Sequence, residues 1–237
     1  MTNELLWGVT LVCNFGGISL AYRLWGKTGL YCWVAMAAIL ANMQVMKTVS
    51  LFGMVATLGN IIYGTSFLAT DILSENHGKA AARQAVAIGF FSLIFTTGAM
   101  NLALLYIPHE SDFAQGPMQA LFSLMPRVAL ASLAAYGISQ YHDVWAYDFW
   151  RKRFPHVRHI WIRNNCSTRV SQLLDTAVFV SIAFAGIYSW PVLAQIFCST
   201  YVLKLLVALA DTPFVYLARR WKDRGVAGGP AETLQQG

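Results

Sequence analysis

The chain has 237 residues, of which 57% are hydrophobic and only 12% are charged. A soluble domain carries charge on about a quarter of its residues, so this composition indicates a polytopic membrane protein. The apolar runs are continuous rather than alternating, which excludes a β-barrel. The net charge of +6 comes from short loops between apolar runs, a placement that suits membrane topology better than binding of nucleic acid.

The sequence also lacks the usual signatures of a metal centre or a hydrolase. Its four cysteines show no paired or metal-like spacing. Neither an H-E-x-x-H nor a G-x-S-x-G motif is present. We therefore predict no cofactor and no enzymatic activity.

Seven apolar segments follow one another, each near the ~20 residues that cross a bilayer. They cover residues 5–25, 29–46, 49–73, 84–107, 119–148, 169–189 and 192–218. The first segment has no basic stretch before it, so we interpret it as a spanning helix and not as a cleaved signal. We expect an all-α polytopic membrane helix bundle, with one integral membrane domain over residues 1–221 and a disordered cytoplasmic tail over 222–237.

The loop charges predict the orientation of the chain. If seven helices alternate, fourteen of the 17 Lys and Arg residues fall on one side of the membrane. The acidic loop at 108–117 falls on the opposite side. By the positive-inside rule, the N-terminus is outside and the C-terminus is cytoplasmic.

A polar stripe marks the third segment and the loop after it. Asn60, Tyr63, Phe67, Asp71 and Glu75 are spaced by three and four residues, so they share one face of a helix. A carboxylate inside a membrane costs about 2.5–3.5 kcal/mol on insertion scales unless it is paired or hydrated. The stripe therefore predicts an interior face and a binding site.

The fifth segment carries a second polar face, formed by Tyr136, Ser139, Gln140 and Asp143. Arg127 is half a turn out of phase with this face. Its side chain either reaches out to the outer membrane interface or contributes to the site.

The sixth and seventh segments add further charged residues. Gln172 and Asp175 open the sixth segment, and Asp175 is deeper than a helix cap requires. Thr200, Lys204 and Asp211 share one face of the seventh, with Lys204 close to mid-membrane. Lys204 either forms a structural ion pair with an acid on another helix or serves substrate or coupling.

Together these residues suit a planar, hydrogen-bonding heterocycle as ligand. Carboxylates accept from ring N–H groups and exocyclic amines, while a cation or an amide donates to a carbonyl. A sugar fits this set less well, and an inorganic ion poorly. The candidate substrate-binding residues are Asn60, Tyr63, Asp71, Glu75, Arg127, Gln140, Gln172, Asp175 and Lys204.

Four blocks of sequence carry a resemblance to a known family. They are the run from Tyr63 to Arg83 (YGTSFLATDILSENHGKAAAR), Arg127 with Ser139, Gln140 and Asp143, the set Arg163-Asn-Asn, Ser171-Gln172 and Asp175-Thr176, and Tyr201–Lys204 with Thr212-Pro213. In this order they resemble the queuosine precursor transporters, also called the vitamin uptake transporter family. The resemblance covers about residues 29–218.

The resemblance implies a six-helix core, to which segment 5–25 is an addition. It also implies uptake of 7-deazaguanine precursors of queuosine across the bacterial inner membrane, for use in tRNA modification. These precursors are 7-cyano-7-deazaguanine (preQ0), 7-aminomethyl-7-deazaguanine (preQ1) and queuine. The partners are then the small-molecule substrate and the lipid bilayer, with no direct contact to nucleic acid.

Alternative functions are open at this point. The chain could be the substrate-binding subunit of an ATPase-driven vitamin uptake system, docked through the small residues Ala37 and Ala41. It could also be an intramembrane enzyme that uses Asp71 and Asp175 as paired carboxylates, or a structural protein. We take a solitary secondary carrier as the first interpretation.

Overall fold

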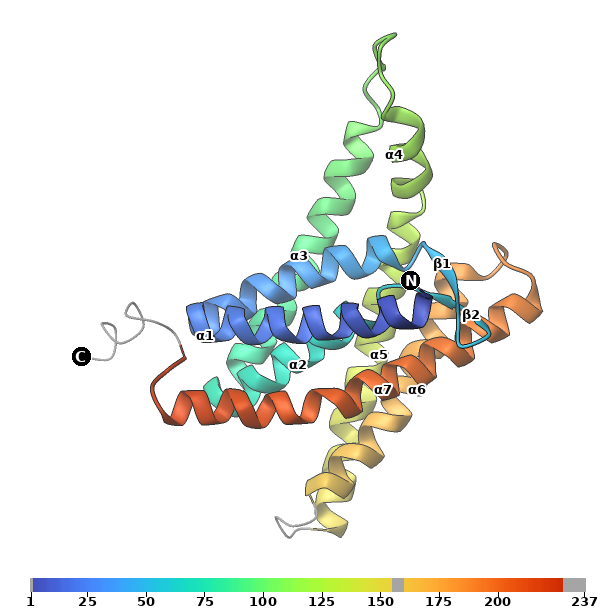
Figure 1. The fold of residues 1–237 in the computed structure, drawn as a ribbon. Coiled ribbons are helices and arrows are strands. Elements are labelled where there is room, and N and C mark those ends of the chain that lie inside the picture. The colour runs from blue at the N-terminus through green and yellow to red at the C-terminus, as the bar shows by residue number, and fades with distance from the viewer. Residues whose placement is uncertain (1, 155–159, 228–237) are drawn as a thin grey trace.

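The computed structural model describes residues 2–154 and 160–227, and within α5–α7 some side chains, among them that of Gln140, lie outside the described part. The elements in order are α1 (Asn3–Gln44), β1 (Thr48–Leu51), β2 (Met54–Thr57), α2 (Asn60–His77), α3 (Lys79–Ala103), α4 (Gln115–Phe122), α5 (Met125–Arg153), α6 (Ile160–Phe184) and α7 (Trp190–Asp223). Figure 1 shows that α1, α2 and α7 run side by side, that α3 and α5 cross them, and that α4 lies beside the outer end of α3.

Helix α1 consists of two helical halves joined at a sharp turn. Gly26 has φ 54° and ψ −133°, which breaks the helical geometry, and the second half returns along the first (Figure 1). A positive φ of this kind is accessible to glycine at little cost. The predicted segments 5–25 and 29–46 are therefore both present.

The predicted third segment, 49–73, is wrong in its first part. Strands β1 and β2 form an antiparallel hairpin, with Val49 opposite Ala56 and Leu51 opposite Met54. The turn residues Phe52 and Gly53 both have positive φ, as two-residue hairpin turns require. The helix begins only at Asn60, so α2 has 18 residues.

Side chains from two helices hold the hairpin in place. The Asn3 amide in α1 donates to the Ser50 carbonyl at 2.8 Å. In α7, Gln195 accepts from the Val55 N–H at 3.2 Å, and the Ser199 hydroxyl donates to the Val55 carbonyl at 2.9 Å. The hairpin is thereby fixed between the start of α1 and the start of α7.

Two further boundaries differ from the prediction. The fifth segment, predicted as 119–148, is divided at residues 123–124 into α4 and α5, and Pro126 lies in the first turn of α5, where proline is tolerated. Helix α7 continues to Asp223, so the predicted tail of 222–237 begins inside a helix. Residues 228–237 of that tail lie outside the described part.

Within the described residues, four helical stretches are long and apolar enough to cross a membrane by length and composition: Asn3–Gln44, Lys79–Ala103, Gln115–Ser139 and Trp190–Asp223. Large apolar side chains on them point outward, including Phe91 (69% exposed) and Phe95 (65% exposed). Such exposure suits a surface surrounded by lipid rather than water. The protein is an all-α membrane bundle as predicted, with the hairpin as an addition.

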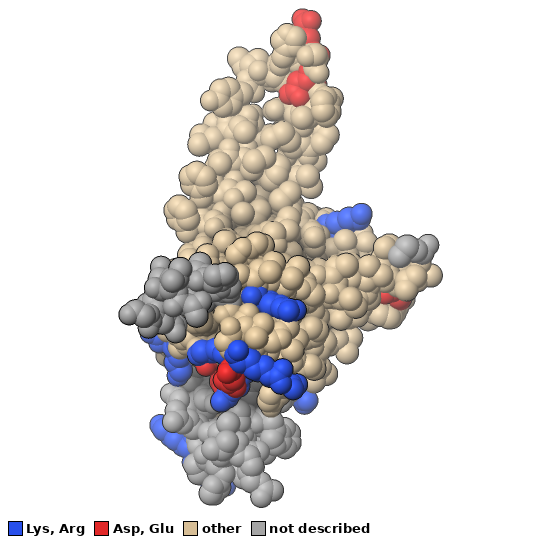
Figure 2. Space-filling view, turned by 60° about the vertical axis from the view of Figure 1, so that its left-hand side comes forward, with Lys and Arg blue, Asp and Glu red and all other residues tan. Residues whose placement is uncertain are grey.

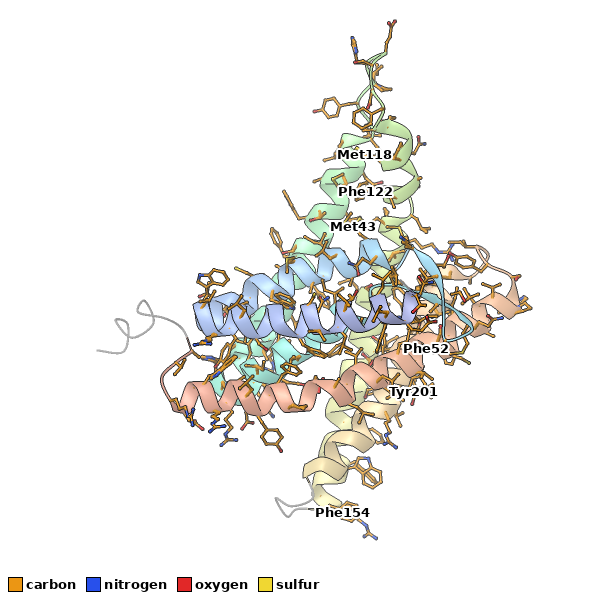
Figure 3. All side chains as sticks on the ribbon, in the orientation of Figure 1. Met43, Phe52, Met118, Phe122, Phe154 and Tyr201 are labelled. Carbon is orange, nitrogen blue, oxygen red and sulfur yellow. The ribbon has the colours of Figure 1, made fainter. Side chains whose placement is uncertain are left out.

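Three larger apolar clusters form most of the interior of the described residues. The largest joins both halves of α1 to α2 and α7, around Tyr22, Leu68 and Leu73. A second lies between α5, α6 and the start of α7. The third joins α1, α3, α4 and α5, and Figure 3 labels its members Met43, Met118 and Phe122. Helix α7 contributes to the first two clusters, so it packs against both parts of the bundle.

The turn of α1 depends on a close backbone approach at Gly29. A Cβ at this position would lie 2.2 Å from the Ala21 carbonyl oxygen, whereas a Cβ at Gly16 in the same helix would meet nothing within 4 Å. We predict that Gly29→Ala destabilises the protein by about 1–3 kcal/mol, as for other overpacked sites, and that Gly16→Ala does not. Thermal unfolding of both variants in detergent measures this. Equal unfolding temperatures would contradict the tight turn.

Candidate functional site

A buried ion pair lies where α6 meets α7. The Lys204 ammonium donates to Oδ2 of Asp175, and the two side chains are 6% and 2% exposed. An isolated charge at such a position would lose its hydration without compensation. The structure thus gives Lys204 an acidic partner on another helix, which is one of the two predicted alternatives.

Tyr63 brings α2 to the same point. Its hydroxyl donates to Oδ1 of Asp175 at 3.1 Å, and the Lys204 Nζ lies 4.8 Å from the centroid of its ring. This distance is within the range of a cation–π interaction. Both oxygens of Asp175 therefore have a donor, and three helices meet at one carboxylate.

Small residues allow α2 to approach its neighbours this closely. A Cβ at Gly64 would lie 2.3 Å from a methyl carbon of Val207, so α2 and α7 are in direct contact there. Gly59, just before α2, has φ +90° and lies against the Ala41 carbonyl of α1. Because Tyr63 lies beside Gly64, and Lys204 one turn before Val207, this contact puts the tyrosine ring next to the ammonium.

A small cavity opens on one side of this cluster. Its polar lining comes from five helices: Asn42 of α1, Asn60 and Tyr63 of α2, Ser132 of α5, Asp175 of α6, and Thr200 and Lys204 of α7. We call it the first cavity.

Several polar groups of the first cavity are already hydrogen-bonded. The Ser132 hydroxyl donates to the Asn42 side-chain oxygen at 2.6 Å, and the Asn60 amide donates to the Thr57 carbonyl at 3.0 Å. Thr200 differs, because its hydroxyl is buried and has no hydrogen-bond partner among the described residues. A buried hydroxyl without a partner is costly, so Thr200 is a group that a ligand could satisfy.

A second, smaller cavity lies between α2, α6 and α7. It is lined by Gly64, Phe67, Gln172, Ala208 and Asp211, together with Tyr63 and Lys204. Tyr63 and Lys204 thus line both cavities. The side-chain oxygen of Gln172 is buried and has no partner among the described residues.

The polar stripe of α2 is interior only in its first part. Asn60 is buried and Tyr63 and Phe67 are half-buried, but Asp71 and Glu75 are exposed. Glu75 pairs with Arg219 near the end of α7, where both side chains are solvent-accessible. Asp71 interacts electrostatically with Tyr136 but lines neither of the two cavities. The predicted interior face is therefore wrong for these two acids, because the packed side of this part of α2 carries Ile72, Leu73 and Asn76, which are buried, while the acids are exposed.

Arg127 lies away from both cavities. Its guanidinium donates to the carbonyls of Ile182 at 2.6 Å and Ala185 at 2.5 Å, at the C-terminal end of α6. Carbonyls at a helix end have no partner within the helix, and a cation is favourable there. Arg127 thus caps α6 rather than reaching out to the membrane interface.

Three polar residues of the first cavity were absent from the predicted set: Asn42, Ser132 and Thr200. Thr200 shares a helical face with Lys204, so its position could be inferred from the spacing of four residues. Asn42 and Ser132 come from distant helices, and no local pattern connects them. Within the described residues, no cluster of three or more His, Cys, Asp or Glu side chains could hold a metal ion.

The ion pair generates a testable prediction. Removing one partner leaves a buried charge alone, so Asp175→Asn or Lys204→Met should each destabilise the protein by about 3–5 kcal/mol. The double variant should recover most of the stability, because neither charge remains. Thermal unfolding of all three variants in detergent measures this. A double variant no more stable than either single one would contradict a mutual pairing.

Comparisons with known proteins agree with one another. The family model described as "Putative vitamin uptake transporter" matches residues 57–218. A "Probable queuosine precursor transporter" of Bacillus subtilis is 46% identical over 220 residues, which is 93% of this chain and 96% of that protein. A protein of the same description from Haemophilus influenzae is 27% identical over 162 residues, which is 67% of this chain and 66% of that protein. No solved structure matches the chain. The chain belongs to the vitamin uptake transporter family.

Proposed function

We propose that this protein imports queuosine precursors, with 7-cyano-7-deazaguanine and 7-aminomethyl-7-deazaguanine as substrates and queuine as a further candidate. The single observation that carries the proposal is the 46% identity to a queuosine precursor transporter over nearly the whole chain. The match covers 93% of this chain and 96% of that protein.

The chemistry of the first cavity supports this class of substrate. A 7-deazaguanine has ring N–H and amino donors on one edge and a carbonyl acceptor beside them. The Asp175 carboxylate can accept from the donors, while the Lys204 ammonium and the Thr200 hydroxyl can donate to a carbonyl. Hydrogen bonds to charged groups contribute about 1.5–3 kcal/mol each, which is enough to select a base by its edge.

The alternative as an intramembrane enzyme has no support from the geometry. It requires Asp71 and Asp175 to act together, and Asp71 is exposed and lines neither cavity. Asp175 has its two oxygens engaged by Tyr63 and Lys204 instead.

The predicted small-residue motif is not available to an ATPase partner. Ala37 and Ala41 are buried (0% and 6% exposed) and pack against Ile62 of α2, so they join helices within this chain. We therefore propose a solitary carrier. Uptake of labelled precursor by lipid vesicles that contain only this protein, without ATP, tests this; a requirement for an added ATPase would contradict it.

We propose an orientation in the inner membrane with the N-terminus outside and the C-terminus in the cytoplasm. In Figure 2 the acidic residues at the tip of the arm formed by α3 and α4 lie far from most of the visible Lys and Arg, which gather in the lower half. The tip corresponds to the loop with Glu110 and Asp112. This separation of charge supports the orientation inferred from the positive-inside rule.

Transport is tested in bacterial cells that cannot make the precursors and are supplied with 7-cyano-7-deazaguanine. We expect queuosine in their tRNA, measured by mass spectrometry, only when the protein is present. The matched control is the double variant Asp175→Asn, Lys204→Met, which should be as abundant as the wild type but inactive, because it removes both charged ligand groups. Queuosine at equal levels with and without the protein would contradict the proposed function.

Orientation is tested by single cysteines at Asp112 and Arg153 in a background without native cysteines. An impermeant thiol reagent added outside intact cells should label the cysteine at position 112 and miss the one at position 153. Permeabilised cells serve as the control, in which both should react. The reverse pattern in intact cells would place the acidic loop in the cytoplasm.

A further inference from the structure

The two cavities follow one another along the bundle. On α2, the first cavity is lined by Asn60 and the second by Phe67. On α7, the corresponding residues are Thr200 and Ala208. The ends of these two helices also meet, through the Glu75–Arg219 pair, so they run in the same direction. At 1.5 Å per residue, these lining residues lie about 10–12 Å apart along each helix, and the second cavity is displaced toward those ends by less than this, because Tyr63 and Lys204 line both cavities.

Helix α6 indicates the same displacement of the second cavity, although its residue numbers run in the opposite direction. It packs against α7 and precedes it through a short turn, so the two are antiparallel (Figure 1). The first cavity is lined by Phe179 and the second by Gln172, seven residues nearer the start of α6. All three helices therefore place the cavities in series along one line.

The partition between the cavities is the cluster of Tyr63, Asp175 and Lys204. Tyr63 and Lys204 line both cavities, and each binds Asp175. Opening this partition requires that both donors release the carboxylate. A ligand that offers N–H groups to Asp175 and a carbonyl to Lys204 can replace those bonds as it enters.

The second cavity has the groups that a planar base needs. Gln172 offers a buried oxygen without a partner among the described residues, which can accept an N–H. The ring of Phe67 forms an apolar wall and is held edge-on by Tyr63, with ring centroids 5.0 Å apart. Asp211 adds a carboxylate on the same lining. This combination of an aromatic wall with acceptors resembles the content of the first cavity.

We propose that the second cavity is a separate subsite for the same heterocycle, occupied after the substrate has passed the Tyr63–Asp175–Lys204 partition. The inference rests on the proposed function, because it takes the queuosine precursors as the ligand. It assigns Gln172 to the second subsite and Thr200 to the first, so the two residues act on different steps of one passage.

Two matched alanines allow the subsites to be tested separately. Ala41 lines only the first cavity and Ala208 only the second. Single variants Ala41→Cys and Ala208→Cys, in a background without native cysteines, are purified and treated with a small thiol reagent with and without 7-cyano-7-deazaguanine. At ten times the Kd, labelling should slow roughly tenfold at both positions, because few subsites stay empty. The control is a protein that keeps Cys198 as its single cysteine. This residue is exposed on α7 and absent from both linings, so it should react at an unchanged rate.

The outcomes separate this inference from the proposed function. Protection at position 41 alone would overturn the second subsite and leave the proposed function intact. Protection at neither position, with both cysteines reactive, would overturn the choice of ligand and both proposals with it. A cysteine at 208 that reacts only after denaturation would also overturn the subsite, since a ligand could not reach it.

A second variant gives a measurement that does not depend on labelling at position 208. Gln172→Leu removes the acceptor while keeping a similar volume, so the fold should be retained. We expect transport into vesicles to fall roughly three- to tenfold, as for the loss of one hydrogen bond, while protection at position 41 is unchanged. Thr200→Val should instead weaken protection at position 41. Transport at the wild-type rate in Gln172→Leu would contradict the role of the second subsite.

Discussion

The structure depends on the pairing of two opposite charges in a medium where neither is tolerated alone. Asp175 and Lys204 are almost fully buried, and each removes the cost of burying the other. The geometry that achieves this involves three helices, because Tyr63 of α2 binds the free oxygen of the carboxylate and covers the ammonium with its ring. Gly64 matters for the same reason, since it lets α2 approach α7 closely enough for that contact. The hairpin β1–β2 is hydrogen-bonded to Gln195 and Ser199 in the first part of α7, the helix that also carries Lys204.

The other ion pair among the described residues contributes less to stability. Glu75 and Arg219 also pair, but both are largely exposed, and exposed pairs contribute about 0–1 kcal/mol at most. Arg127 uses its charge differently, by binding the carbonyls that α6 leaves unpaired at its end. The acids and bases that sequence patterns place near the candidate site thus have three different roles. Asp175 and Lys204 form the pair between the two cavities. Glu75 and Arg219 pair at the surface where α2 and α7 end, and Arg127 caps the C-terminal end of α6.

The sequence predicts the helices well because a run of about 20 apolar residues has few alternatives in a membrane. It fails at residues 49–57, where valines, leucine and phenylalanine suit a strand as well as a helix and only the Phe52-Gly53 turn distinguishes them. Spacing alone indicates that Lys204 needs an acid, but not that the acid is Asp175 on α6 rather than Asp71 on α2. That choice is made by the close approach at Gly64 and by the orientation of α2 about its axis, which leaves Asp71 on an exposed face. Asn42 and Ser132 are hydrogen-bonded to each other but lie 90 residues apart in the sequence, so no local sequence pattern predicts their contact.

Two of the buried atoms without partners among the described residues bear on how a resting ion pair is compatible with the proposed transport. Thr200 and Gln172 lie on opposite sides of the Tyr63–Asp175–Lys204 cluster, in different cavities. On the proposed path, a ligand that moves from one to the other meets the ion pair and can replace its bonds with N–H and carbonyl groups of its own. The protein would then not have to expose an unpaired charge to lipid, because the charges would bind either each other or the substrate.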